Sequence, residues 1–361
     1  MAELAVQKLI YLAPFSGSSG VGDYSDDFAL AITPHVGELV EVRYPAARSA
    51  SVRDVWRYRR ELRQLLAESD PSSTVIHSEL SGGSIVPFWA TFGLKGVART
   101  VTIHDAPRPV WFPFLTKGVA NKSMMTRAIH GPLNALCFRM ERRSLRRSGV
   151  VVLTRAGAQS VRAARIGATV LEGGLLIPHR PDVPAIDERP RAVGLFGHVY
   201  KGKGFSLLTE IREALDDDVA IRVAGRGTES LAPIAGVEVL GEVVGAGEDE
   251  FFASIRLLLL PYRRRPVMRL LPFHASATHA RAVAYRTPSM ALRSQTMDEL
   301  AAEGTCLIVD GGPAELAHAA GVYLSSDDAA EKAVHGIDHF RERMTDESLI
   351  EPFLELWRRP R

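Results

Sequence analysis

Residues 197–204 read GHVYKGKG, which has the spacing of a phosphate-binding loop: a glycine, four residues, a second glycine and Lys203. The apolar run AVGLF precedes this segment, and FSLLTEI, which reads as a helix, follows it. Backbone N–H groups of a glycine turn and of a helix start attract anions, so this setting favours phosphate chemistry. A nucleoside-triphosphate loop needs a hydroxyl after its lysine to hold magnesium, and Gly204 has none. A diphosphate-binding turn and an ordinary exposed turn remain as interpretations.

Two further turns carry residues suited to anions. Arg226 lies in AGRGT, at the end of another apolar run, where it could contact a nucleotide or remain a surface arginine. Gly20 and Gly22 follow the first apolar run in PFSGSSGVGD and would let backbone N–H groups approach phosphates. A tight turn in which Ser19 or Asp23 caps a helix explains the same glycines, and the two interpretations are compatible.

Polar side chains also end two runs in the first half. His104 and Asp105 end TVTIHD, and Glu79 lies in VIHSELSGG, before two glycines. A histidine at a strand end could donate a hydrogen bond to a sugar or act at the reacting centre. A capping aspartate beside a satisfied histidine, and a glutamate that caps a helix, are the structural alternatives.

The elements that would position these residues alternate along the chain. Short apolar runs are separated by longer amphipathic stretches, which is typical of βαβ units and parallel sheets. Helices are expected between the strands, for example at 206–215 and 248–255. The expected strands are 9–13, 39–43, 74–77, 101–104, 150–154, 192–196, 220–224, 237–240, 257–260, 287–291 and 306–309.

The stretch IPHRPDVPAIDERPRAV separates the two halves. It has four prolines, mixed charges and no periodicity, so it is interpreted as an interdomain linker. We therefore expect an α/β protein of two Rossmann-like domains, whose ligands bind at the carboxyl ends of the strands.

The composition limits the partners. The 361-residue chain has 46% hydrophobic and 24% charged residues and a net charge of +2, which argues against nucleic acid as a partner. Its two cysteines lie far apart in apolar surroundings, which fits a reducing cytoplasm. The N-terminal apolar run is too short for a signal peptide, and no run approaches the length of a spanning helix.

One segment is enriched in cations. Residues 111–147 mix aromatic, methionine and leucine side chains with eight lysines and arginines. Such a segment suits an anionic membrane surface, so a peripheral location on the inner face of the plasma membrane is expected. A surface helix whose arginines form local ion pairs is the alternative.

The order and spacing of the motifs resemble GT-B glycosyltransferases, especially the large retaining group numbered family 4. Gly197 and the pair Lys203-Gly204 match the strand end and helix start of that group's donor domain. The segments IRVAGRGTE, VEVLGEV, DEFFASIRLLLLPY, ASATHARAVAYRTPSMA and EGTCLIVDGG resemble the rest of that domain. PFSGSSGVGDYSDDF, VTIHDAPRP and FLELWRR resemble segments of the acceptor domain and the last helix.

The resemblance covers nearly the whole chain and implies the GT-B architecture, with parallel sheets in two domains that face a central cleft. It implies an acceptor domain over 1–177, a linker over 178–192, a donor domain over 193–345 and a helix over 346–361 that crosses back to the first domain.

Two departures from the family pattern concern the donor site. His198 stands where arginine is usual, and the family's two glutamates correspond to Phe273 and Arg281. The turn ASAT, with Ser276 and Thr278, resembles the variant turn of members that lack the pair. Arg281 would then grip phosphate or stack on the base, with His274 and His279 nearby.

The function implied by the resemblance is sugar transfer from a nucleotide-diphosphate sugar to a cell-surface glycan, glycolipid or small molecule. No metal or other cofactor is expected, so cationic side chains and helix starts stabilise the departing diphosphate. The catalytic residues would be Lys203 and His104. The donor site would comprise Gly20, Gly22, Gly197, His198, Lys203, Arg226, Ser276, Thr278 and Arg281, and the acceptor side Asp23, Glu79 and Asp105.

The stereochemistry and two alternative functions stay open. Retention would use the leaving phosphate as base, whereas inversion would need a base such as Asp23, Glu79 or His104. The missing glutamate pair also fits a non-catalytic GT-B domain that binds a nucleotide sugar or a protein partner. An epimerase of nucleotide sugars shares the fold but would require several carboxylates in the cleft.

Overall fold

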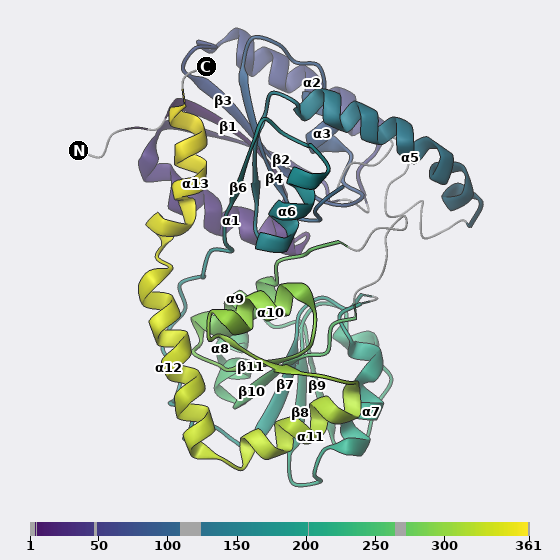
Figure 1. The fold of residues 1–361 in the computed structure, drawn as a ribbon, viewed down its shortest axis with the longest axis vertical. Helices are drawn as coiled ribbons and strands as arrows, with labels where there is room; N and C mark the ends of the chain where they lie inside the picture. The colour runs from purple at the N-terminus through teal and green to yellow at the C-terminus, as the bar shows by residue number, and fades with distance from the viewer. Residues whose placement is uncertain are drawn as a thin grey trace. The chain divides into compact units, whose positions relative to one another are not determined.

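The chain folds into two compact units (Figure 1). The computed structural model describes residues 4, 6–46, 49–108, 124–200, 202–263 and 272–359, without the side chains of 124–132 and 134. Unit 1 comprises Met1–Leu176, Pro266–Ala275 and Asp346–Arg361, and unit 2 comprises Ile177–Arg265 and Ser276–Thr345.

Unit 1 is built on a six-stranded parallel sheet with the order β2-β1-β3-β4-β5-β6. Its strands are β1 (Val6–Pro14), β2 (Val36–Tyr44), β3 (Thr74–Leu80), β4 (Ala98–Ile103), β5 (Gly149–Val152) and β6 (Thr169–Glu172). Its helices are α1 (Gly20–Ile32), η1 (Thr33–His35), α2 (Val52–Ala67), α3 (Val86–Thr91), α5 (Met124–Leu145), α6 (Arg155–Ala163) and α13 (Asp346–Arg358).

The central strands of this sheet are buried on both faces. Alternate side chains of β1 point to opposite faces, as in any strand. Ile10 and Leu12 join the apolar cluster beneath α2 and α3. The intervening Tyr11 packs against Phe28 of α1, and Phe28 in turn packs against Phe353 of α13, with ring centroids 5.2 and 4.6 Å apart. The helix at the end of the chain is therefore part of the core of unit 1.

Unit 2 contains a second parallel sheet, with the order β12-β11-β10-β7-β8-β9. Its strands are β7 (Ala192–Phe196), β8 (Ala220–Ala224), β9 (Val237–Gly241), β10 (Leu257–Leu260), β11 (Ser289–Leu292) and β12 (Cys306–Val309). Its helices are η2 (Phe205–Leu207), α7 (Leu208–Ala214), η3 (Thr228–Ser230), α8 (Ala246–Ala253), α9 (Ala277–Ala284), α10 (Gln295–Ala302), α11 (Pro313–Leu324) and α12 (Asp327–Arg343).

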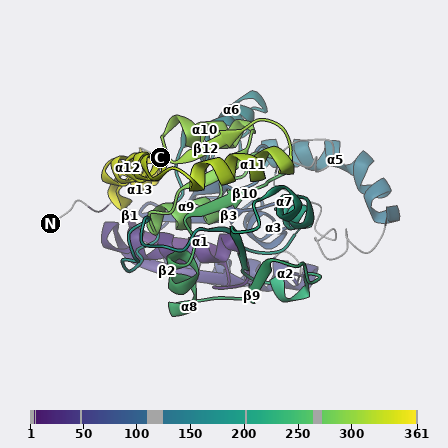
Figure 2. The ribbon, with the colours of Figure 1, turned by 90° about the horizontal axis from the view of Figure 1, so that it is seen from below.

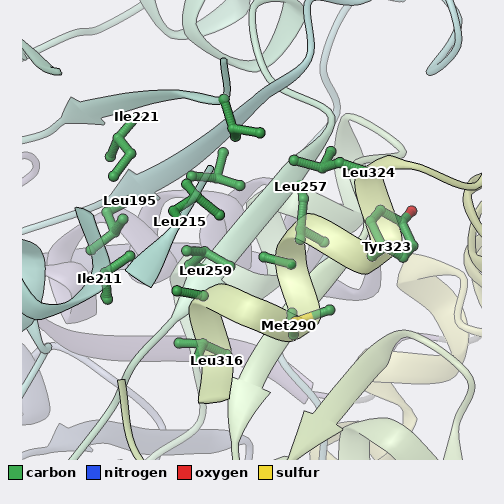
Figure 3. Packing of buried hydrophobic residues seen from close by; sticks show 14 of the residues in the cluster. Leu195, Ile211, Leu215, Ile221, Leu257, Leu259, Met290, Leu316, Tyr323 and Leu324 are labelled. Atoms are coloured by element: carbon green, nitrogen blue, oxygen red, sulfur yellow. The ribbon is translucent and has the colours of Figure 1, made fainter. Parts of the chain in front are cut away.

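Apolar side chains fill both faces of this sheet. The strand β10 is four consecutive leucines because both faces of a central parallel strand are covered. Leu257 and Leu259 pack with Ile211 of α7 and Leu316 of α11 (Figure 3). Leu258 and Leu260 belong to the cluster on the opposite face. In Figure 2, α7 and α11 lie side by side over their face of the sheet.

The predicted fold class is confirmed: both sheets are parallel and flanked by helices. The bounds expected for β7, β8, β10 and β12 agree with the structure. The prediction missed β6, because this edge strand is only half-buried and lacks an apolar run. The expected helix over 206–215 begins instead as the 3-10 turn η2 and becomes α-helical only at Leu208.

The stretch expected to be a linker packs against unit 2 through Arg189. Its guanidinium donates hydrogen bonds to the Pro184, Phe252 and Tyr285 carbonyl oxygens and to the Thr287 hydroxyl. Proline content and missing periodicity predict irregular backbone but give no sign of such an anchor.

Two observations bear on the expected membrane surface. Within the ranges that the structure covers, no helix combines the length and hydrophobicity needed to cross a bilayer. Much of the cationic segment 111–147 lies outside the described residues, and α5 forms its later part. Its membrane role stays a prediction.

Candidate functional site

The loop with the phosphate-loop spacing lies at the topological switch point of the unit 2 sheet. β7 lies between β10 and β8, so the chain leaves β7 in one direction and later returns to its other side. Loops that follow two such adjacent strands diverge and leave room for a ligand at their carboxyl ends. Here these are the loop after β7, described at 197–200 and 202–204, and the segment 261–263 after β10. The sequence places Lys203 and Tyr262 on these two loops.

Two positions in this region require glycine for steric reasons. Gly225 has a φ of +125°, and a Cβ on it would lie 2.3 Å from the Gly197 carbonyl oxygen. Gly204 has a φ of +87°, and a Cβ there would lie 2.3 Å from the Pro261 carbonyl oxygen. The turns after β7, β8 and β10 therefore pack backbone against backbone.

Lys203 is held by side chains from two other segments of unit 2. Its Nζ donates hydrogen bonds to the Tyr262 hydroxyl at 2.5 Å and the Thr278 hydroxyl at 3.0 Å, and lies 4.2 Å from the centre of the Tyr262 ring. Burial lowers the pKa of Lys203, but the neighbouring Tyr262 and Tyr200 outweigh that effect and leave the pKa above its usual value. The ammonium group is therefore charged at neutral pH and fixed in position.

The start of α9 adds further polar groups beside Lys203. Ser276 caps this helix by accepting a hydrogen bond from the His279 N–H, and its hydroxyl lies 3.1 Å from that of Tyr262. The first N–H groups of a helix have no acceptor within it, and they carry partial positive charge. Ser276, Thr278 and Lys203, all predicted for the donor site, thus gather at one helix start.

His198 and Arg226, also predicted for the donor site, lie together on the turns after β7 and β8. The Arg226 Nη1 is 2.8 Å from the His198 Nε2, and its Nε donates to Glu242 at 2.7 Å. The sequence departs from the family pattern at His198, and the structure places the guanidinium of Arg226 beside that position.

Three other residues expected near the donor pocket have structural partners. Arg281 forms an ion pair with the buried Glu248, which also pairs with Arg180 at 3.1 Å. His279 is buried between the hydroxyls of Ser289 and Thr305, and burial lowers its pKa to about 4.

The third, His274, belongs to unit 1, where its Nδ1 lies 2.5 Å from the Asp105 carboxylate. Asp105 also accepts a hydrogen bond from the Gly82 N–H. It therefore links the segment of Gly82 to the segment of His274 within unit 1. A sequence motif could not reveal these pairings, because the partners lie far along the chain.

Glu79, predicted for the acceptor side, lies in a cluster of polar side chains of unit 1. Its Oε2 lies 2.6 Å from the His104 Nε2, and its Oε1 accepts a hydrogen bond from the Tyr11 hydroxyl at 2.9 Å. His77 approaches the same Oε1 at 3.4 Å. Burial raises the pKa of Glu79, but the hydrogen bonds from His104 and His77 outweigh it and bring the pKa well below its usual value. Glu79 is therefore an ionised buried carboxylate rather than a helix cap.

The glycine turn after β1 contains one structurally required glycine and one open position. Ser19 caps α1 by accepting a hydrogen bond from the Gly22 N–H, and a Cβ on Gly22 would lie 2.4 Å from the Phe15 carbonyl oxygen. A Cβ on Gly20 would meet no atom within 4 Å. Asp23 lies in the first turn of α1. The capping explanation accounts for Gly22, whereas the space beside Gly20 is open.

Sequence reasoning overlooked Tyr262, Tyr11 and Glu248 as members of these clusters. Tyr262 ends the apolar run LLLLPY, where a tyrosine has no distinctive spacing to other polar residues. Tyr11 lies in the middle of an apolar strand, and Glu248 lies on an acidic helix start, so neither type nor spacing marks them.

Comparison with solved structures shows which proteins share this fold. HepE from Anabaena, solved with UDP-glucose, has 13% identity and a TM-score of 0.66 over 96% of this chain and 98% of that chain. WaaG, a glycosyltransferase involved in lipopolysaccharide biosynthesis, has 11% identity and a TM-score of 0.61 over 97% and 99%.

TarM from S. aureus, solved with UDP, has 14% identity and a TM-score of 0.61 over 84% of this chain, which spans 59% of that protein. No protein-family model matches the chain, and no curated protein sequence is significantly similar. The structural likeness shows that the chain has the fold of the GT-B glycosyltransferases.

Proposed function

We propose that the chain is a glycosyltransferase that moves a sugar from a nucleotide-diphosphate sugar to a hydroxyl acceptor. The observation that carries the proposal is the fixed, charged Lys203 at the switch point of the unit 2 sheet, beside the start of α9. Glycosyl transfer requires stabilisation of a departing diphosphate, and preorganised cations and helix starts supply it.

In this proposal, different residues of unit 2 contact different parts of the donor. Lys203 contacts the diphosphate, Ser276 and Thr278 fix the lysine and the helix start, and Gly197 allows close approach of backbone. Arg226, which lies beside His198, is proposed as a second contact to the donor on the neighbouring turns. Arg281 contributes through its ion pair with Glu248, which holds α9 against α8, rather than by gripping phosphate.

We further propose that the reaction needs no metal or other cofactor and retains the configuration of the sugar. The leaving diphosphate would then serve as the base, so no protein nucleophile is required. His104, held by Glu79, is proposed to bind a sugar or acceptor hydroxyl in unit 1, beside Asp105 and Asp23. Gly20 and Gly22 are proposed to present backbone N–H groups to an anion.

The acceptor is proposed to be a cell-surface glycan, a glycolipid or a small molecule. The support comes from WaaG, which is described as involved in lipopolysaccharide biosynthesis, and from TarM, solved with a glycerol-linked N-acetylglucosamine. A cytoplasmic protein that docks on the anionic inner face of the plasma membrane would fit a lipid-linked acceptor.

The test has a binding stage and a turnover stage. Thermal unfolding is measured with UDP, GDP and ADP and their common sugar conjugates, because a ligand of the folded state raises the melting temperature. The nucleotide sugar that binds is then incubated with the protein, and both free nucleotide and sugar products are analysed.

We expect the melting temperature to rise with the nucleotides of one base only, and the matching nucleotide sugar to release its nucleoside diphosphate. UDP is the first candidate, because HepE and TarM were solved with it. Binding without turnover would support the non-catalytic alternative, and an isomerised nucleotide sugar would support an epimerase. The absence of any shift at millimolar nucleotide would contradict the proposal.

A further inference from the structure

A buried polar network lies on the face of the unit 1 sheet that α1 and α13 cover. Residues two apart in a strand share a face, so His77 and Glu79 of β3 lie on one side. The register pairs His77 with Tyr11 of β1 and with Thr100 of β4. These polar groups are buried beneath Phe28, Phe353 and Trp357, whose rings lie 5.4–5.8 Å from that of His77.

The hydrogen bonds of this network run in one direction. Trp357 can only donate, and its Nε1–H donates to the Thr100 hydroxyl at 2.9 Å. Thr100 can then give its own proton to the His77 Nδ1, at 2.8 Å. A neutral His77 that accepts at Nδ1 carries its proton on Nε2, which faces Thr102 at 2.9 Å and Glu79 at 3.4 Å.

The network ends at the carboxylate of Glu79, which can only accept when ionised. Its side chain is fully buried, whereas 11% of the His104 side chain is exposed. The Nε2 of His104 must therefore carry the proton that it shares with Glu79. Among the described residues, the Nδ1 of His104 has no hydrogen-bond partner, so it is the nitrogen open to a ligand.

We propose that Glu79 is a positioning residue that holds His104 as the Nε2–H tautomer and presents its Nδ1 as a hydrogen-bond acceptor for a substrate hydroxyl. This inference rests on the proposed function for the identity of that hydroxyl, a sugar or acceptor group. It reverses the expected role of His104 from donor to acceptor. It also gives α13 a role in the site, because Trp357 begins the network.

Nuclear magnetic resonance of the full chain tests the tautomer without any substrate. The histidines are labelled with ¹⁵N, and His104→Gln assigns the His104 ring. We expect a far-downfield proton on Nε2, because hydrogen bonds to an ionised acceptor are short and strong. We also expect Nδ1 to have the chemical shift of an unprotonated nitrogen.

Three variants then test the role of Glu79. Glu79→Gln keeps an acceptor but loses the charge, so the downfield proton should move upfield; Glu79→Met keeps the size but offers no acceptor, so that signal should vanish. Tyr11→Phe removes only one hydrogen bond to Glu79 and serves if the Glu79 variants fail to fold. Glu38→Gln, on the exposed side of β2, is the matched control and should change nothing.

The kinetic measurement is release of UDP from UDP-glucose with water as acceptor. We expect kcat/KM to fall roughly tenfold to a hundredfold in Glu79→Gln, the size expected for one weakened charged hydrogen bond, while UDP affinity stays unchanged. A proton on the Nδ1 of His104 in the wild-type protein would overturn the inference, as would a downfield signal that survives in Glu79→Met. Unchanged kcat/KM in an active enzyme would also overturn it, whereas lack of wild-type turnover would count against the proposed function alone.

Discussion

Replacing Lys203 by methionine tests the donor site most directly. The substitution keeps the length of the side chain and removes its charge. An ammonium group has three N–H donors, and the hydroxyls of Tyr262 and Thr278 occupy two of them. One donor is left for an oxygen of the diphosphate. A hydrogen bond with charged partners contributes about 1.5–3 kcal/mol, so nucleotide-diphosphate affinity should fall roughly 10- to 150-fold.

The fold should tolerate this change. Tyr262 keeps its contact with the Ser276 hydroxyl at 3.1 Å, and Thr278 still donates to the Phe196 carbonyl oxygen at 3.3 Å. Loss of the cation–π contact with Tyr262 lowers the stability of the fold, whereas removal of a buried charge raises it, so the two effects oppose each other. We therefore expect the free energy of unfolding without ligand to change by about 1 kcal/mol or less.

Isothermal titration calorimetry with the nucleotide diphosphate selected by the thermal panel measures the effect. At a ligand concentration of about 100 times the wild-type Kd, bound nucleotide stabilises the wild type by about 2.7 kcal/mol. A hundredfold loss of affinity would reduce that stabilisation to about 0.4 kcal/mol. Lys332→Met, on the exposed surface of α12 in the same unit, is the control and should bind like wild type. Wild-type affinity in Lys203→Met would refute the assignment of the diphosphate to this lysine.

The other predictions concern the glycine turn, acid stability and metal dependence. Gly22→Ala should destabilise the protein, because its Cβ would press on the Phe15 carbonyl oxygen, whereas Gly20→Ala should keep the melting temperature and lower turnover. Burial lowers the pKa of His279 from 6.5 to about 4, so below pH 6.5 the unfolded chain binds a proton that the folded chain does not. Stability should therefore decline as pH falls from 6.5 to 4, by about 3 kcal/mol in total, and this component should be absent in His279→Gln. Turnover should persist in excess EDTA, because cationic side chains are proposed to carry the diphosphate charge.

Each of these outcomes has a clear contrary result. Equal melting temperatures for Gly22→Ala and wild type would contradict the close approach at Phe15. Full activity of Gly20→Ala would remove that position from the proposed site. Parallel pH–stability curves for wild type and His279→Gln would show that His279 titrates normally. Activity that EDTA abolishes and added Mg²⁺ restores would show that a metal takes part.

Local patterns determined much of the fold. The alternation of apolar runs with amphipathic stretches predicted the strands, among them the four leucines of β10, which the structure buries on both faces. The turn after β7 was also predicted, because glycines mark such turns through local stereochemistry, whereas the turn before α9 was expected only from the resemblance to the family. The edge strand β6 was missed, since half-exposed positions carry little hydrophobic signal.

Pairings between distant segments were decided only by the tertiary structure. Residue type and strand-end position selected Lys203 and His104, but not their partners Tyr262 and Glu79, because the partner of a charge depends on strand order and register. The same reason explains why Arg281 pairs with Glu248, and why Trp357, near the end of the chain, contacts β4. Sequence periodicity fixes which face a side chain takes, whereas the packing of strands and helices fixes what it meets there.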